Sequence, residues 1–131
     1  MPFVSVTRLR LRSLRFFPAF FWITRSSARQ ARRAPGCLGI RLRKTRGLTF
    51  WTLSAWESEQ EMAVFRGQSP HREAMARLPQ WCDEASVAHW IEEAAEWSSW
   101  DRAARRLQEQ GRLSLVLHPS AAHADGRIDI S

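Results

Sequence analysis

The chain has 131 residues, which is the size of a single domain. Hydrophobic residues make up 44% and charged residues 25%, so the composition is that of a globular protein and excludes a disordered or fibrous one. Cys37 and Cys82 are the two cysteines, too few for a disulfide framework in a domain of this size, and they favour two reduced thiols in a cytoplasmic protein.

The net charge of +7 is distributed unevenly. Residues 1–56 contain twelve arginines and lysines and no acid, whereas residues 57–131 contain eight basic and thirteen acidic residues. The basic half could bind nucleic acid, an anionic membrane surface or the acidic half of a second copy, or it could form solvated faces. Its arginine-rich start is similar to a mitochondrial transit peptide, but we favour an integral strand and helix, because their removal would leave later strands without partners.

Taken in chain order, the pattern predicts a ferredoxin-like α+β fold. Alternation of apolar and polar residues predicts strands at 3–12, 37–44, 48–56 and 85–92. Helices are expected at 13–33, at 58–67 after a capping box that begins at Ser58, and from Ser69–Pro70 to Pro79. The order βαββαβ is typical of a sandwich with two helices on one face of the sheet.

The remaining sequence predicts an extension. An extra helix is expected at 98–110 and a short strand at 113–118. We therefore divide the chain into a domain of residues 1–118, with its core at 2–92 and its extension at 93–118, and a polar tail at 119–131. The strand at 48–56 is apolar on both faces, so we expect a second copy to cover the free sheet face in a homodimer.

At this point the sequence resembles the dimeric α/β-barrel superfamily, specifically antibiotic biosynthesis monooxygenases and spheroidene monooxygenase. The resemblance covers roughly residues 2–92. It is carried by four runs: Phe50–Ser58, Met62–Arg66, Pro70–Met75 and Trp81–Trp90. It implies a dimeric α/β barrel that oxidises an apolar, flat or polyene substrate. The superfamily includes cofactor-free oxygenases, haem-binding oxygenases and proteins with no known activity, so haem is one candidate cofactor.

His71 is the candidate catalytic residue. The first turn of a helix lowers the pKa of an imidazole and favours its neutral form, which can act as a base or ligate haem iron. The competing interpretation is a histidine at the helix start with no ligand. His89 is expected to be a core or interface residue, and no set of side chains has the spacing of a metal site.

The candidate ligand-binding residues are mostly tryptophans. Strand tryptophans can line a pocket for a flat ligand, and they can equally fill a core or an interface. An arginine could neutralise an acidic ligand such as a haem propionate. The full set is Arg8, Trp51, Trp56, Met75 and Trp90.

Two classes of function remain after these observations. The first is a small monooxygenase-like enzyme, and the alternative is a non-catalytic barrel protein that binds an apolar small molecule. An RNA-recognition domain has the same βαββαβ order, but Ser5, Leu48 and Leu53 stand where its stacking aromatics are required. We therefore expect no specific nucleic-acid partner, and the apolar run Phe16–Ile23 is too short to span a membrane.

Overall fold

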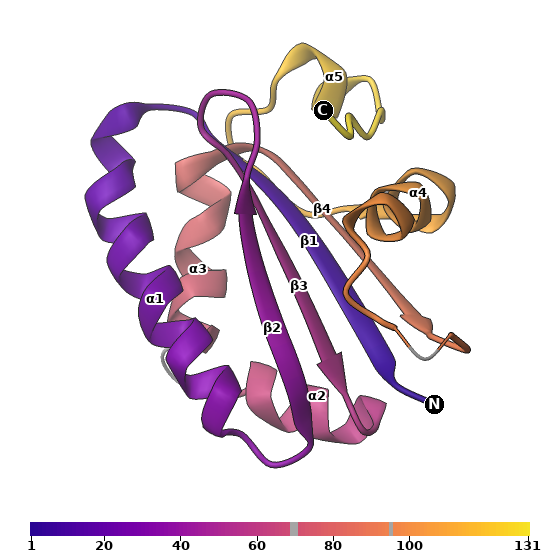
Figure 1. Ribbon diagram of the computed structural model, residues 1–131. Coiled ribbons are helices and arrows are strands. Elements are labelled where there is room, and N and C mark those ends of the chain that lie inside the picture. Colours follow the sequence, from indigo (N-terminus) through magenta and orange to yellow (C-terminus); the bar gives the residue numbers. More distant parts are fainter. Residues whose placement is uncertain (69–70, 95) are drawn as a thin grey trace.

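The computed structural model describes residues 1–68, 71–94 and 96–131. Its centre is an antiparallel sheet with the strand order β2-β3-β1-β4-β5 (Figure 1). The strands are β1 (Phe3–Leu11), β2 (Cys37–Lys44), β3 (Thr49–Trp56), β4 (Cys82–Ile91) and β5 (Arg112–Leu113). The helices are η1 (Leu14–Phe16), α1 (Phe17–Arg33), α2 (Glu59–Arg66), α3 (His71–Trp81), α4 (Trp100–Gln110) and α5 (Ala121–Ala124). The predicted α+β, ferredoxin-like fold is confirmed.

The central strand β1 divides the sheet into two faces of different character. Successive side chains of a strand point to opposite sides, so Val4, Val6 and Arg8 share one face, and Ser5, Thr7 and Leu9 share the other. Helices α1, α2 and α3 cover the face of Thr7, and α4 covers the face of Val6 (Figure 1). We call these the cavity face and the α4 face.

The helices of the cavity face begin where the sequence predicts. The Ser13 side chain accepts a hydrogen bond from the Arg15 backbone at the start of η1, and Ser58 accepts one from Glu61 at the start of α2. The predicted helix start at Ser69–Pro70 lies outside the described residues.

Helix α3 continues beyond the predicted end at Pro79. It reaches Trp81 although Pro79 cannot donate a backbone hydrogen bond to the preceding turn. Its last carbonyls are bonded by distant backbone: Leu117 donates to Pro79 at 2.8 Å and Arg12 donates to Trp81 at 2.9 Å. This tertiary capping was not visible in the sequence.

The chain covers the α4 face itself. Ala103 and Leu107 of α4 are fully buried in one cluster with Trp51 and Leu53 of β3. Trp97, just before α4, lies over β2 at Gly39, where an added Cβ would be 2.5 Å from the indole ring. The strand β3, which is apolar on both faces, is therefore covered on the α4 face by its own chain. The argument for a dimer through this face no longer holds.

The last residues also pack against the sheet. Instead of a strand at 113–118, only Arg112–Leu113 pairs with β4, and a short helix follows at Ala121–Ala124. Ile128 and Ile130 then pack against the cluster beneath α4. Residues 119–131 are thus part of the folded domain. Among the described residues, no helix is long and apolar enough to cross a membrane.

Candidate functional site

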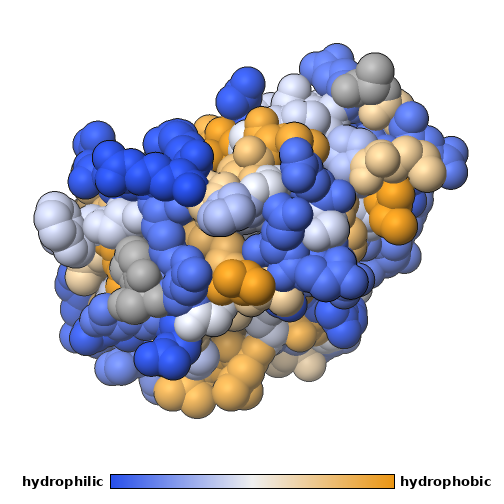
Figure 2. Space-filling view, turned by 90° about the horizontal axis from the view of Figure 1, so that it is seen from below, coloured by the Kyte–Doolittle hydropathy of each residue, from blue (hydrophilic) through white to orange (hydrophobic). Residues whose placement is uncertain are grey.

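A cavity of about 360 Å³ lies between the sheet and helices α1, α2 and α3. This volume falls at the small end of the range for ligand pockets. The cavity draws its lining from all five strands and from helices α1, α2 and α3. Figure 2 views the molecule from the end where α2 lies, and there apolar surface lies between hydrophilic side chains.

The floor of the cavity is a group of hydroxyl side chains in the middle of the sheet. Ser5 pairs with Ser54, and Thr7 pairs with Thr52, so that four hydroxyls from β1 and β3 sit side by side. These side chains are short, and they leave open the space that large side chains fill on the α4 face. One hydroxyl is already engaged, because the Trp56 indole donates to Ser54 Oγ at 3.1 Å.

The roof of the cavity is apolar. Phe20 and Ile23 come from α1, Phe65 from α2, and Ala74 and Leu78 from α3. These positions recur at three- and four-residue intervals, which is why each helix turns one apolar side toward the sheet. A ligand held here would contact rings and aliphatic chains above and hydroxyls below.

His71 lies in this cavity, at the first residue of α3. Its ring packs against Phe65 with 4.7 Å between the ring centroids. Its Nδ1 atom is buried and has no hydrogen-bond partner among the described residues. Burial lowers the pKa of His71; a backbone hydrogen bond at Arg66 opposes this and the positive charge of Arg66 adds to it, so that the pKa is lowered on balance. The imidazole is therefore neutral near pH 7, with burial rather than the helix end as the main cause.

His89 is a second cavity histidine, which the sequence interpretation placed in the core or an interface. It stands on β4 directly opposite Ser5 of the hydroxyl floor. Its ring lies 5.6 Å from that of Phe3. Burial lowers the pKa of His89, and the charges of Arg66 and Arg112 act in the same direction. The signal that places His89 in the cavity is its pairing with Ser5. This pairing becomes visible only when β4 is known to lie next to β1 in the sheet.

The structure brings only part of the predicted site together. Met75 lines the cavity beside His71 and is 52% exposed, so it lies at the edge of the cavity. Trp56 is fully buried and stacks on Phe65 at 5.0 Å, which places it behind the cavity wall. Trp51 and Trp90 lie in the cluster beneath α4, on the other face of the sheet.

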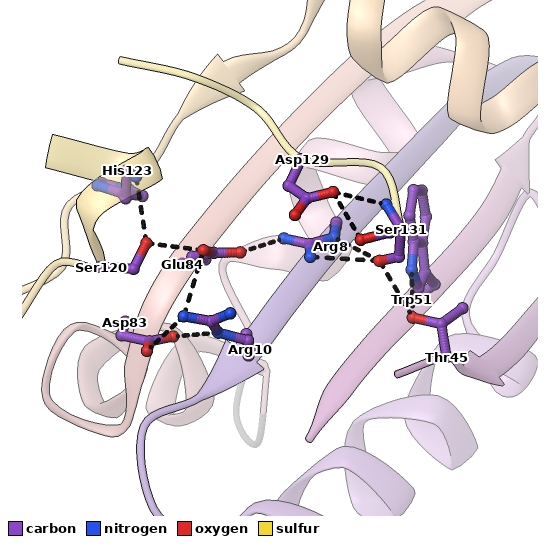
Figure 3. Close-up of polar contacts among 10 residues, drawn as sticks. All are labelled: Arg8, Arg10, Thr45, Trp51, Asp83, Glu84, Ser120, His123, Asp129 and Ser131. Carbon is purple, nitrogen blue, oxygen red and sulfur yellow. Dashed lines mark hydrogen bonds and ion pairs between the residues drawn. The ribbon is translucent and has the colours of Figure 1, made fainter. Parts of the chain in front are cut away.

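Arg8 also lies on the α4 face, where it cannot reach the cavity. It is 3% exposed, and its Nη1 donates to Glu84 Oε1 at 2.7 Å. Ser120 donates to the other oxygen of Glu84 at 2.7 Å, and Arg10 pairs with Asp83 at 2.9 Å (Figure 3). Arg8 thus joins β1, β4 and the C-terminal residues, and its contacts are those of a structural residue.

The network around Glu84 holds that carboxyl in its charged form. Burial alone would raise its pKa, but hydrogen bonds from Ser120 and Arg8 and the charges of Arg10 and Arg8 outweigh it, so the pKa of Glu84 is lowered. The position of Arg8 follows from strand alternation, because it shares its face with Val4 and Val6.

The donor groups of the cavity are compatible with haem. An imidazole nitrogen is one of several protein ligands that can hold haem iron, and arginines can pair with the carboxylates of haem. His71 supplies such a nitrogen, and Arg66 and Arg112 line the same cavity. Among the described residues, no group of three or more His, Cys, Asp or Glu side chains is arranged to hold a metal ion.

Comparison with known proteins shows the fold but no close relative. No family model matches the chain. No curated protein matches it either. A putative antibiotic biosynthesis monooxygenase from Nitrosomonas europaea is 14% identical, with a TM-score of 0.64 and coverage of 72% of this chain and 92% of its own.

Two further solved structures have a similar fold at similarly low sequence identity. A protein from Mycobacterium tuberculosis is 15% identical, with a TM-score of 0.66 over 73% of this chain and 100% of its own. A point mutant of the cofactor-independent oxygenase SnoaB from Streptomyces nogalater is 12% identical, with a TM-score of 0.60 and coverage of 72% of this chain and 95% of its own. More than a quarter of this chain thus lies beyond the shared fold. The chain has the fold of the antibiotic biosynthesis monooxygenase-like proteins, as the sequence resemblance predicted.

Proposed function

We propose that this protein is a small monooxygenase-like enzyme that binds an apolar, flat substrate in the cavity, with His71 as the general base. The observation that carries the proposal is a neutral imidazole whose buried Nδ1 has no partner among the described residues, in a cavity with an apolar roof. Its fold is shared with proteins described as antibiotic biosynthesis monooxygenases and as a cofactor-independent oxygenase, which supports the proposal.

The cavity residues supply three steps of such a reaction. Phe20, Phe65 and Leu78 bind the flat rings of the substrate and exclude water. The hydroxyls of Thr7 and Thr52 orient its polar edge. His71 then accepts a proton from an acidic O–H or C–H group, because a neutral imidazole in hydrogen-bond reach is a competent base.

The proposed chemistry balances without a further reductant. A flat polycyclic phenol that has lost a proton to His71 is electron-rich enough to reduce dioxygen itself. The ring carbon that reacts loses its one hydrogen and gains one oxygen atom as a carbonyl, and the phenol oxygen, which has lost its proton to His71, becomes the second carbonyl. The other oxygen atom of dioxygen leaves as water with these two hydrogens. A substrate that cannot form such an anion, such as a polyene, would need both haem, which would supply the activation of oxygen, and a separate donor of two electrons, which would reduce the second oxygen atom to water.

The second candidate function is non-catalytic binding of an apolar small molecule in the same cavity. The hydroxyl floor and apolar roof favour binding as much as catalysis. We also retain a cytoplasmic location as a proposal, based on the free thiols of Cys37 and Cys82. A homodimer stays a proposal too, but it would have to use a surface other than the sheet face that α4 occupies.

The test is oxygen consumption with a panel of polycyclic phenols, comparing wild type with His71→Ala. We expect the phenol to bind both proteins, while turnover falls on the order of 10²-fold or more in the variant. His118→Ala is the matched control, because this exposed histidine does not line the cavity. Its turnover should equal that of wild type.

Three results would change the assignment. Undiminished turnover in His71→Ala would remove the general base from the proposal. Binding of the phenols without any oxygen uptake by wild type would favour the non-catalytic alternative. A Soret band formed with added haem and lost in His71→Ala would favour haem-dependent chemistry.

A further inference from the structure

The outward surface of the first helix exposes large apolar side chains close together. Leu14 of η1 is 69% exposed, and Phe21 and Trp22 of α1 are 48% and 73% exposed. Single exposed apolar residues are normal on protein surfaces, but a cluster within nine residues of one segment marks an interaction surface. Phe21 stacks on Phe17, with ring centroids 5.6 Å apart, so the aromatic group is ordered.

Arginines follow these side chains along the same helix. Arg25 and Arg29 are exposed one and two turns after Trp22, and Arg32 and Arg33 are exposed at the helix end. None of them forms an ion pair with a carboxylate in the part of the chain that the structure describes. No acidic residue occurs before Glu57, so η1 and α1 themselves carry no carboxylate.

The β2–β3 hairpin adds further charge beside the start of the helix. Leu11, just before η1, donates its backbone hydrogen bond to Leu48 of the hairpin at 3.0 Å. The hairpin and the N-terminal end of α1 lie at the same end of the molecule (Figure 1). Lys44 and Arg46 of this hairpin are exposed.

We propose that this surface, which we call the α1 docking face (Leu14, Arg15, Phe21, Trp22, Arg25 and Arg29), binds the surface of an anionic lipid bilayer. Tryptophan and phenylalanine partition to the interfacial region, and arginines beside them bind lipid phosphates. Each cation near an anionic surface strengthens binding, so the aromatic and basic groups act together. This inference does not rest on the proposed function.

The charge of the face decides against a second copy, and the packing of Phe21 decides against a single-stranded nucleic acid. A second copy related by a two-fold axis would bring arginine against arginine, which is repulsive. A single-stranded nucleic acid would require open aromatic faces on which its bases could stack. The ring of Phe21 is not open, because Phe17 stacks on it and the guanidinium of Arg25 lies 5.5 Å from its centroid. Leu14 has no ring on which a nucleobase could stack, but its aliphatic side chain can contact a lipid acyl chain.

The opposite side of the same helix forms a wall of the cavity. Phe20, Ile23 and Ser27 point into it, while Phe21 and Trp22 point outward. A protein docked through α1 would therefore hold its cavity next to the membrane interface, one helix diameter away.

The test is co-sedimentation of the full chain with lipid vesicles. We expect binding to vesicles of phosphatidylcholine and phosphatidylglycerol in equal parts, and little binding to phosphatidylcholine alone. The double variant Phe21→Ala, Trp22→Ala should weaken binding to the anionic vesicles on the order of tenfold or more. Arg25→Gln should weaken it about fivefold, and more so at low salt.

Two matched controls separate docking from general changes of surface. Val64→Ala removes an exposed apolar side chain from α2, and Arg105→Gln removes an exposed arginine from α4. Both should bind anionic vesicles as wild type does. The single variants should unfold at the wild-type temperature because their changed side chains are exposed, and the double variant should unfold only slightly lower, because Phe21 loses its stacking on Phe17.

Absence of binding to the anionic vesicles would overturn the proposal. So would binding that Phe21→Ala, Trp22→Ala leaves unchanged. Self-association in light scattering that the same double variant abolishes would assign the face to a second copy instead. Salt-resistant binding of single-stranded RNA that needs Trp22 would assign it to nucleic acid.

Discussion

The two faces of the sheet are built from the same strands but are filled in opposite ways. On the α4 face, Val4, Val6, Leu53 and Leu107 are 0% exposed and pack in one cluster. On the cavity face, the middle of the same strands carries serine and threonine, and a cavity of about 360 Å³ remains above them. One face is filled for stability, whereas the other is left hollow.

This difference separates the residues that maintain the fold from those that are candidates for chemistry. Large side chains between neighbouring strands exclude a ligand on the α4 face. Short hydroxyl side chains on the cavity face cannot contact the helices above them, so they leave space that an apolar ligand can occupy. We therefore expect substitutions on the α4 face to change stability, and substitutions on the cavity face to change binding.

The largest effect is expected for Trp51→Ala on the α4 face. Trp51 is almost fully buried and meets Trp100 edge-on at 6.5 Å, so its removal should lower the free energy of unfolding by about 3–5 kcal/mol. The counterpart on the cavity face is Met75→Ala, which should cost under about 1 kcal/mol because the side chain is half exposed. Urea unfolding measures both, and equal losses would contradict the division between the faces.

The next effect is expected for Arg8→Ala. This change leaves the buried carboxylate of Glu84 without its closest cation and should cost about 3 kcal/mol, the lower end for a broken buried pair, because Arg10 remains 3.3 Å away. If Arg8 instead bound a ligand, the loss would appear in ligand affinity with stability unchanged. Replacing both partners, Arg8→Met with Glu84→Met, should recover most of the stability, because no buried charge is then left alone.

The smallest effect is the pH dependence that comes from the cavity face. The pKa values of His71 and His89 are lowered in the folded protein, mainly by burial. Between the ordinary histidine pKa of about 6.5 and the lower folded values, the unfolded chain therefore binds more protons, and stability decreases as pH falls through this range. The variant His71→Gln should flatten this slope in thermal unfolding. An unchanged slope in His71→Gln would contradict a buried, neutral His71.

The order of the elements was predictable because each depends on local pattern. Alternation located β1, β2 and β3 to within about a residue, and Ser58 marked the start of α2 as a cap. The end of α3 was predicted too early, since the groups that bond its last carbonyls come from Arg12 and Leu117, far away in the sequence.

The candidate site was predictable only in part, for a related reason. His71 lies at a helix start that sequence reasoning could locate, and the structure places it in the cavity. The tryptophans could not be assigned in the same way. Trp51 and Trp56 are on one strand but on opposite faces, and which face would be hollow depends on what covers each of them.

Local patterns predicted most of the helices and strands, the βαββαβ order and the position of one histidine at the start of a helix, because periodicity, caps and turns act over a few residues. Long-range packing, by contrast, places α4 and the C-terminal residues over the second sheet face, buries Arg8 in an ion pair and brings His89 into the same cavity as His71. These outcomes depend on which distant segments exclude water from each other, and a local pattern carries no information about that choice.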